Sequence, residues 1–337
     1  MFKYYRINFF LISLIILLFI LLLCSGGLLI FRDSIIVVCD YFKFDSIAFY
    51  LVLLVVLLGV YSNCCFVDKL GCTRVRAFLL VRLIFSILCF LFYELSMLPL
   101  LYLIFSSSPY SERFLAGLPL VLMLIYLIVS IYLSGYIMKL GLLGVYRCSY
   151  FIFDSSLIKY LFLCFLTSVC FLILDGKRWL AFLSLSHIVV PFIGLFIIIN
   201  NSFLYCLGHG LRAGIVFGLL WYLYDSSNRR NWLLLKSSIK SKDIMLLVIV
   251  SILTLCSFPT TIQFFCEVGL IKYSAENYVY IFFWGLYLFF GGLVPLVLCG
   301  HLLIRREWLE MFSYEKFTMF NFIVLLCLWC FTGLIII

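Results

Sequence analysis

Ionisable side chains lie deep inside long apolar stretches of this sequence. Glu94 lies in LFYELSMLPLL, Lys139 in GYIMKLGLLG and Glu267 in QFFCEVGL, while His187 lies in SLSHIVV and His209 in CLGHGL. A charge at the middle of a bilayer costs at least about 2.5–3.5 kcal/mol on insertion scales, so such residues are functional candidates. Carboxylates, lysines and histidines that recur from segment to segment could pass a proton along a chain.

Other cations in the apolar stretches have simpler explanations. Lys177 and Arg178 directly follow an Asp-Gly pair, so they could extend to the membrane surface from the end of a helix. Lys177 is nevertheless kept as a candidate proton carrier. A lone histidine in such a segment often serves only as a hydrogen-bonded helix contact. Arg82 and Arg212 are expected at the membrane interface or paired with carboxylates, with no role in transport.

The composition shows in which environment the elements that carry these residues must lie. Of the 337 residues, 66% are hydrophobic and 12% are charged. A soluble domain is about 45–50% apolar and about 25% charged. This surplus of apolar surface indicates a polytopic membrane protein and excludes disordered, collagen-like and nucleic-acid-binding classes.

The positive net charge fits the same class. It amounts to +9, and most cations fall between the apolar stretches, as the positive-inside rule describes. The densest cationic loop, 225–242, is expected on the negative, matrix-like side. The apolar run 9–31 is too long for a signal peptide and is expected to be a retained first helix.

The cysteines do not suggest a metal or redox centre. There are fifteen, and most are scattered through apolar runs, where cysteine behaves as a small hydrophobe. Cys327 and Cys330 form a C-x-x-C pair, but no second pair or histidine completes a zinc site. Cys64, Cys65 and Cys72 flank a short loop and could cross-link, although nothing requires it.

The apolar runs predict membrane-spanning helices, because they lack the alternating polarity of barrel strands. Some runs exceed one crossing, so the sequence predicts between 10 and 13 helices. Pro259 should break the helix of 243–270. Connections are short, and none can hold a nucleotide, flavin or haem domain. The expected runs are 9–31, 46–66, 77–107, 115–146, 157–174, 178–200, 203–224, 243–270, 278–304 and 318–337.

A series of motifs resembles a known family. The stretches YELSMLPLL, PYSERFLAG, IMKLGLLGVYR, LDGKRWLAFLSLSHI, LGHGLRAG and FPTTIQFFCEVG occur in this order. Together they resemble the NADH–ubiquinone oxidoreductase chain 4 family, the antiporter-like, proton-pumping subunits of respiratory complex I. The matching stretches run, with gaps, from about Asp45 to Glu267.

The resemblance implies a role for each candidate. Glu94 matches the carboxylate of the fifth helix, which controls proton entry, and Lys139 matches the central lysine of the eighth. Lys177, His187 and His209 match the hydrophilic axis that carries protons along the membrane midplane. Glu267 matches the terminal carboxylate on the broken twelfth helix. Chains 2 and 5 have lysine there, so glutamate favours chain 4.

The sequence also departs from the family. Glu112 and Lys139 are much closer together than their family counterparts, and the lysine partner of Glu94 in the Val-Lys-x-Pro motif is missing. The spacing from Arg74 to Glu94 is short as well. The family has two inverted repeats, and the first should be truncated here. One transmembrane domain is predicted, with N-terminal helices in 1–66, a reduced first repeat in 76–147, a second repeat in 148–304 and a last helix in 318–337.

The resemblance therefore implies an all-α, antiporter-like (Mrp-type) bundle in the mitochondrial inner membrane. Its expected function is proton translocation within the NADH:ubiquinone reductase complex. NADH, FMN, iron–sulfur clusters and ubiquinone would be bound by other subunits. Partners would include chains 2 and 5, accessory subunits, and cardiolipin or other lipids. The alternatives are a structural subunit that no longer pumps, a separate cation/proton antiporter, or a membrane hydrogenase subunit.

Overall fold

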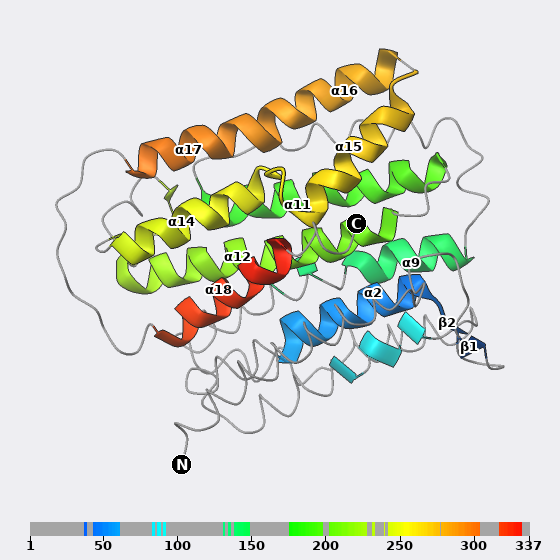
Figure 1. Ribbon diagram of the computed structural model, residues 1–337, viewed down its shortest axis with the longest axis horizontal. Coiled ribbons are helices and arrows are strands. Elements are labelled where there is room, and N and C mark those ends of the chain that lie inside the picture. Colours follow the sequence, from blue (N-terminus) through cyan, green and yellow to red (C-terminus); the bar gives the residue numbers. More distant parts are fainter. Residues whose placement is uncertain are drawn as a thin grey trace. The chain divides into compact units, whose positions relative to one another are not determined.

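In the residues that it describes, the computed structural model is built almost entirely of helices (Figure 1). It describes residues 37–38, 43–60, 138–148, 175–197, 202–227, 242–276, 278–303 and 317–331, together with 231–232, 239 and separate short pieces between 83 and 135. Glu94, Arg82, the apolar run 9–31 and most of the loop 225–242 lie outside the described residues. The chain divides into two compact units, Met1–Cys148 and Ser149–Ile335.

The first unit contains a small hairpin, β1 (Val37–Val38) and β2 (Lys43–Phe44), followed by the helix α2 (Ser46–Val55). The π-helical turn η1 (Val56–Val60) continues α2, and α9 (Met138–Cys148) is the other described helix of this unit. The hairpin is an addition to the expected all-helical fold, but it pairs only two residues on each strand. The class of fold is therefore as predicted.

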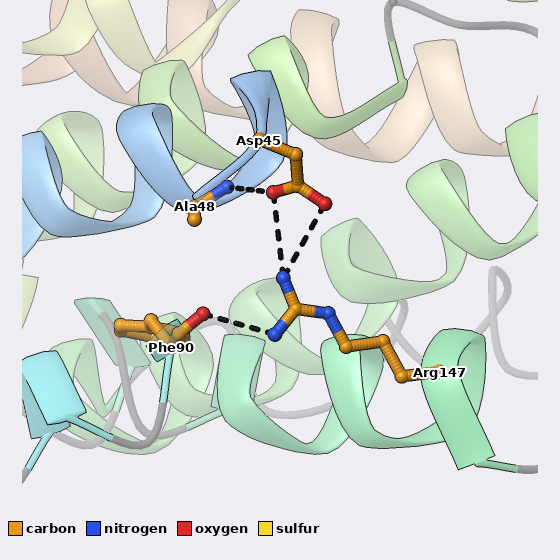
Figure 2. A network of polar contacts seen from close by, with 4 residues as sticks. All are labelled: Asp45, Ala48, Phe90 and Arg147. Atoms are coloured by element: carbon orange, nitrogen blue, oxygen red, sulfur yellow. Dashed lines mark hydrogen bonds and ion pairs between the residues drawn. The ribbon is translucent and has the colours of Figure 1, made fainter. Parts of the chain in front are cut away.

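A buried ion pair joins three segments of the first unit (Figure 2). Asp45 caps the N-terminus of α2 by accepting from the backbone N–H of Ala48 at 2.8 Å. Arg147, in the last turn of α9, donates to the Asp45 carboxylate at 3.3 Å and to the carbonyl oxygen of Phe90 at 3.1 Å. One carboxylate thus caps a helix end and pairs with a buried guanidinium at the same time.

The second unit is organised around α12 (Ser202–Ser227). This helix contacts α11 (Gly176–Phe196), α14 (Lys242–Leu255), α15 (Ile262–Ser274) and α18 (Phe317–Phe331). Because α12 is apolar around most of its circumference, it can be buried on all sides. Every residue of its most apolar stretch is buried in the unit.

One long helix completes the second unit. It comprises α16 (Tyr278–Leu288), the π-helical turn η6 (Phe289–Leu293) and α17 (Val294–Leu303), which follow one line in Figure 1. Trp284 on α16 donates to the Ser274 hydroxyl at 2.9 Å, which links this helix to the end of α15.

Three described helices are long and apolar enough to cross a membrane: Gly176–Leu195, Ser202–Tyr224 and Tyr278–Leu303. They agree with the expected spans 178–200, 203–224 and 278–304. Many of the predicted 10 to 13 helices fall on residues outside the described part. The protein is a multi-pass membrane protein whose described residues are predominantly helical.

Candidate functional site

The helix expected over 243–270 is interrupted around Pro259. α14 ends at Leu255 and α15 begins at Ile262, and each is shorter than the roughly 20 residues that one crossing needs. Proline has no backbone N–H to continue the hydrogen-bond ladder. The interruption leaves non-helical backbone between Leu255 and Ile262, inside the apolar run 243–270.

The end of α14 has the geometry of a Schellman cap. The N–H of Phe258 donates to the carbonyl of Leu253 at 3.3 Å, and that of Ser257 donates to the carbonyl of Thr254 at 3.4 Å. Ser257 has a φ of 51°, at the position where glycine is usual. A serine here accepts backbone strain of about 1–2 kcal/mol, which suggests that its side chain has a role.

Three hydroxyl groups from different parts of the second unit converge on Glu267, on α15. The Ser257 hydroxyl donates to Glu267 Oε1 at 3.0 Å, and the Tyr287 hydroxyl on α16 donates to the same oxygen at 2.9 Å. The Tyr205 hydroxyl on α12 donates at 3.4 Å. Glu267 is 4% exposed, and three hydroxyl groups donate to its carboxyl group.

His187 joins this cluster from α11. Its Nδ1 lies 2.8 Å from the Tyr205 hydroxyl and also bonds the Tyr287 hydroxyl, while the two tyrosine hydroxyls are 3.2 Å apart. Gln263, one turn before Glu267 on α15, donates to the Tyr205 hydroxyl at 2.9 Å. The imidazole is thereby connected to the carboxyl group of Glu267 through a single tyrosine hydroxyl.

Two further residues of α12 complete the site. The ring of His209 lies 5.4 Å from that of His187, centroid to centroid. Arg212 donates from Nη2 to His187 Nε2 at 2.6 Å and from Nη1 to the Ser257 hydroxyl at 3.4 Å. Tyr205, His209 and Arg212 are spaced i, i+4, i+7 and therefore lie on one face of the helix.

Arg212 was expected at the membrane interface or paired with a carboxylate. It is 3% exposed and sits among the polar residues of the second unit, where its charge interacts with that of Glu267. It reaches Glu267 indirectly, through the Ser257 hydroxyl and through His187 and the tyrosines. A buried guanidinium needs hydrogen-bond acceptors, and here they come from an imidazole and a hydroxyl.

Three of the predicted candidates are thus brought together: His187, His209 and Glu267. Lys177 is in the first turn of α11, half-buried, and ten residues, or about 15 Å of helix, separate it from His187. Lys139 belongs to the first unit, where it is 1% exposed and its Nζ donates to the carbonyl oxygen of Ser134. Glu94 is outside the described residues.

Four polar partners were missed from the sequence: Tyr205, Ser257, Gln263 and Tyr287. A signal existed for Gln263, which lies four residues before Glu267 and so shares its helix face. The tyrosines gave no such signal, because tyrosine is common throughout this chain. Six cysteines of the described residues are not joined in disulfides: Cys206, Cys256, Cys266, Cys299, Cys327 and Cys330.

The fold and the site together define a class: a helical membrane protein with a broken helix and a buried network of ionisable groups. Residues 118–293, more than half of the chain, match the family described as NADH:quinone oxidoreductase/Mrp antiporter, transmembrane. The chain belongs to this family, and the second unit's helices from α11 to α16 lie within the match.

A curated relative agrees with the family. The chain is 28% identical over 162 residues to NADH-ubiquinone oxidoreductase chain 4 of Rhipicephalus sanguineus. The alignment covers 43% of this chain and 37% of the relative, so it spans little more than a third of the relative's length.

Proposed function

We propose that this protein is a proton-translocating, antiporter-like subunit of the membrane arm of respiratory complex I, in the mitochondrial inner membrane. It would work beside chains 2 and 5 and accessory subunits. NADH, FMN, iron–sulfur clusters and ubiquinone would react in other subunits, so this chain would contribute to NADH:ubiquinone reductase activity without redox chemistry of its own.

The observation that carries this proposal is the connection between His187 and Glu267. The Tyr287 hydroxyl bonds both His187 Nδ1 and Glu267 Oε1, and the Tyr205 hydroxyl bonds the same two atoms with a longer bond, 3.4 Å, to Glu267. Histidine, tyrosine and glutamate can each release and take up a proton. Their burial on three different helices provides a short route for protons that is shielded from bulk water.

The remaining candidates would also take part in proton transfer. Lys139 and Lys177 would supply protons to His187 and His209 through buried water, and Glu94 would control entry. Glu267 would be the terminal carboxyl group, next to the break in the helix. Half-helices that meet at a break are typical of ion sites in transporters.

The test compares two glutamate variants in the assembled complex. Glu267→Gln removes the buried titratable group but keeps its size and hydrogen-bonding ability. Glu276→Gln makes the same change on an exposed residue just beyond α15 and serves as the control. We expect the Glu267 variant to assemble and to pump fewer protons per electron, while the control pumps as the wild type does. An unchanged proton-to-electron ratio in Glu267→Gln would contradict the proposal.

A second candidate function is that of a structural subunit that no longer pumps. The bond from Arg212 to His187 Nε2 favours it, because a permanent cation there would interrupt the route. In that case the complex would still contain this chain, but Glu267→Gln would leave proton pumping unchanged. Failure of the chain to co-purify with other complex I membrane subunits would exclude both functions.

A further inference from the structure

Arg212 places a fixed positive charge inside the polar cluster. Its guanidinium carries only N–H donors and remains protonated in proteins. In the bond of 2.6 Å between Arg212 Nη2 and His187 Nε2, the imidazole nitrogen must therefore be the acceptor. His187 is consequently neutral, with its proton on Nδ1.

This tautomer orders the hydrogen bonds that follow. The Nδ1–H of His187 donates to the Tyr287 and Tyr205 hydroxyls, and the Tyr287 O–H donates to Glu267 Oε1. In this series of hydrogen bonds, every donor points from His187 toward Glu267. The series of hydrogen bonds can therefore deliver a proton to the carboxylate.

Delivery requires three linked transfers. Glu267 Oε1 takes the hydroxyl proton of Tyr287, the Tyr287 oxygen takes the Nδ1 proton of His187, and His187 Nε2 takes a proton from water or from another group of the axis. The last transfer needs the lone pair of Nε2. Arg212 occupies that lone pair, so in this structure His187 Nε2 cannot take up a proton.

We propose that Arg212 is a gate on this series of hydrogen bonds: it blocks proton uptake at His187 until it moves toward Ser257 and Glu267. The inference rests on the proposed function. Arg212 Nη1 already donates to the Ser257 hydroxyl at 3.4 Å, and that hydroxyl donates to Glu267 at 3.0 Å. A charged Glu267 attracts the guanidinium in this direction, and a protonated Glu267 does not.

The gate closes again only after His187 has been reset. A completed transfer leaves the imidazole proton on Nε2, which cannot accept from Arg212. The proton must return to Nδ1 before the guanidinium can bind again. Arg212 is in this sense a positioning residue, because it acts through the tautomer of His187.

The first experiment measures that tautomer without any proton transport. The chain contains three histidines, so the full-length chain can be labelled with ¹⁵N-histidine in lipid bilayers and studied by solid-state NMR, with His187→Gln to assign the signals. We expect wild-type His187 to carry a bare Nε2. Arg212→Met should raise the share of Nε2-protonated His187 about tenfold, roughly the factor for one hydrogen bond to a charged group. Arg212→Lys, which keeps a cationic donor, should preserve the wild-type tautomer.

The second experiment measures passive proton leak in proteoliposomes that contain the assembled complex without substrate. We expect Arg212→Met to raise the leak about tenfold by the same reasoning. Addition of Glu267→Gln to this variant should return the leak to the wild-type level, because the opened chain ends at that carboxyl group.

The outcomes separate the gate from the proposed function. A protonated Nε2 in wild-type His187, or an unchanged leak in Arg212→Met, would overturn the gate. The wild-type spectrum decides this even if Arg212→Met does not fold. Failure of the proposed function would instead be seen as an unchanged pumping ratio in Glu267→Gln, whatever the tautomer of His187.

Discussion

The Ser257 hydroxyl donates a hydrogen bond to Glu267 across the break between α14 and α15, with 3.0 Å between the two oxygens. The residue that ends one half-helix is therefore bound to the carboxyl group carried by the other. The break and the buried acid are structurally linked, because the residue with the left-handed backbone, Ser257, carries the hydroxyl that bonds Glu267.

Two substitutions at Ser257 separate its backbone from its side chain. Ser257→Ala removes the hydroxyl and keeps the strained conformation, whereas Ser257→Gly removes the hydroxyl and relieves the strain. We expect the glycine variant to be more stable than the alanine variant by about 1 kcal/mol. Thermal unfolding of the purified protein measures the difference, and equal stabilities would show that the conformation is not strained.

The two tyrosines should contribute unequally to proton transfer. The Tyr287 hydroxyl lies 2.9 Å from Glu267 Oε1, and the Tyr205 hydroxyl lies at 3.4 Å. We expect Tyr287→Phe to lower the pumping ratio more than Tyr205→Phe does, with a loss of stability of about 1 kcal/mol in each. The pair controls for the loss of one buried hydroxyl. Equal pumping in the two variants would count against a route through Tyr287.

A glycine beside His209 controls how closely α15 approaches α12. A Cβ added at Gly208 would lie 3.3 Å from the backbone nitrogen of Gln263, so Gly208→Ala must push the start of α15 away. We expect it to destabilise the protein by about 1–2 kcal/mol and to weaken the bond between Gln263 and Tyr205.

The matched control for that substitution is Gly269→Ala, also within a helix. An added Cβ there has nothing within 4 Å, so alanine should stabilise α15 by up to about 1 kcal/mol through its higher helix propensity. Thermal unfolding gives the sign of each change. A stabilising Gly208→Ala would mean that α15 yields without resistance.

The ion pair of the first unit gives a prediction about stability alone. Asp45→Asn keeps a side chain that can cap α2 but removes the charge that Arg147 contacts, at an expected cost of about 3 kcal/mol. Asp45→Ala also removes the cap and should cost about 1 kcal/mol more. Denaturant unfolding of the detergent-solubilised chain measures both variants. Identical losses would show that the bond to Ala48 contributes nothing.

Part of the site could be predicted from the sequence because the signal was local. Glu267, His187 and His209 are conspicuous as ionisable residues in apolar runs, and Pro259 indicates a break from its own chemistry. Arg212 was equally conspicuous, but its type suggested an interface or a carboxylate partner. Its actual acceptors are an imidazole and a hydroxyl from other elements.

The sequence by itself determined the class of protein. An excess of apolar residues over long stretches requires a membrane, and the cost of burying charge marks the functional candidates. The family match follows from the order of motifs. These are properties of composition and of short segments, which do not depend on how the helices pack.

Only the tertiary structure decided which candidates meet. Tyr287 and His187 are 100 residues apart in sequence, and Arg212 and His187 are 25 apart. Such pairs depend on how each helix is rotated about its own axis. Because α12 is apolar on nearly every side, its sequence pattern could not fix that rotation; the packing of α11, α14, α15 and α18 around it did.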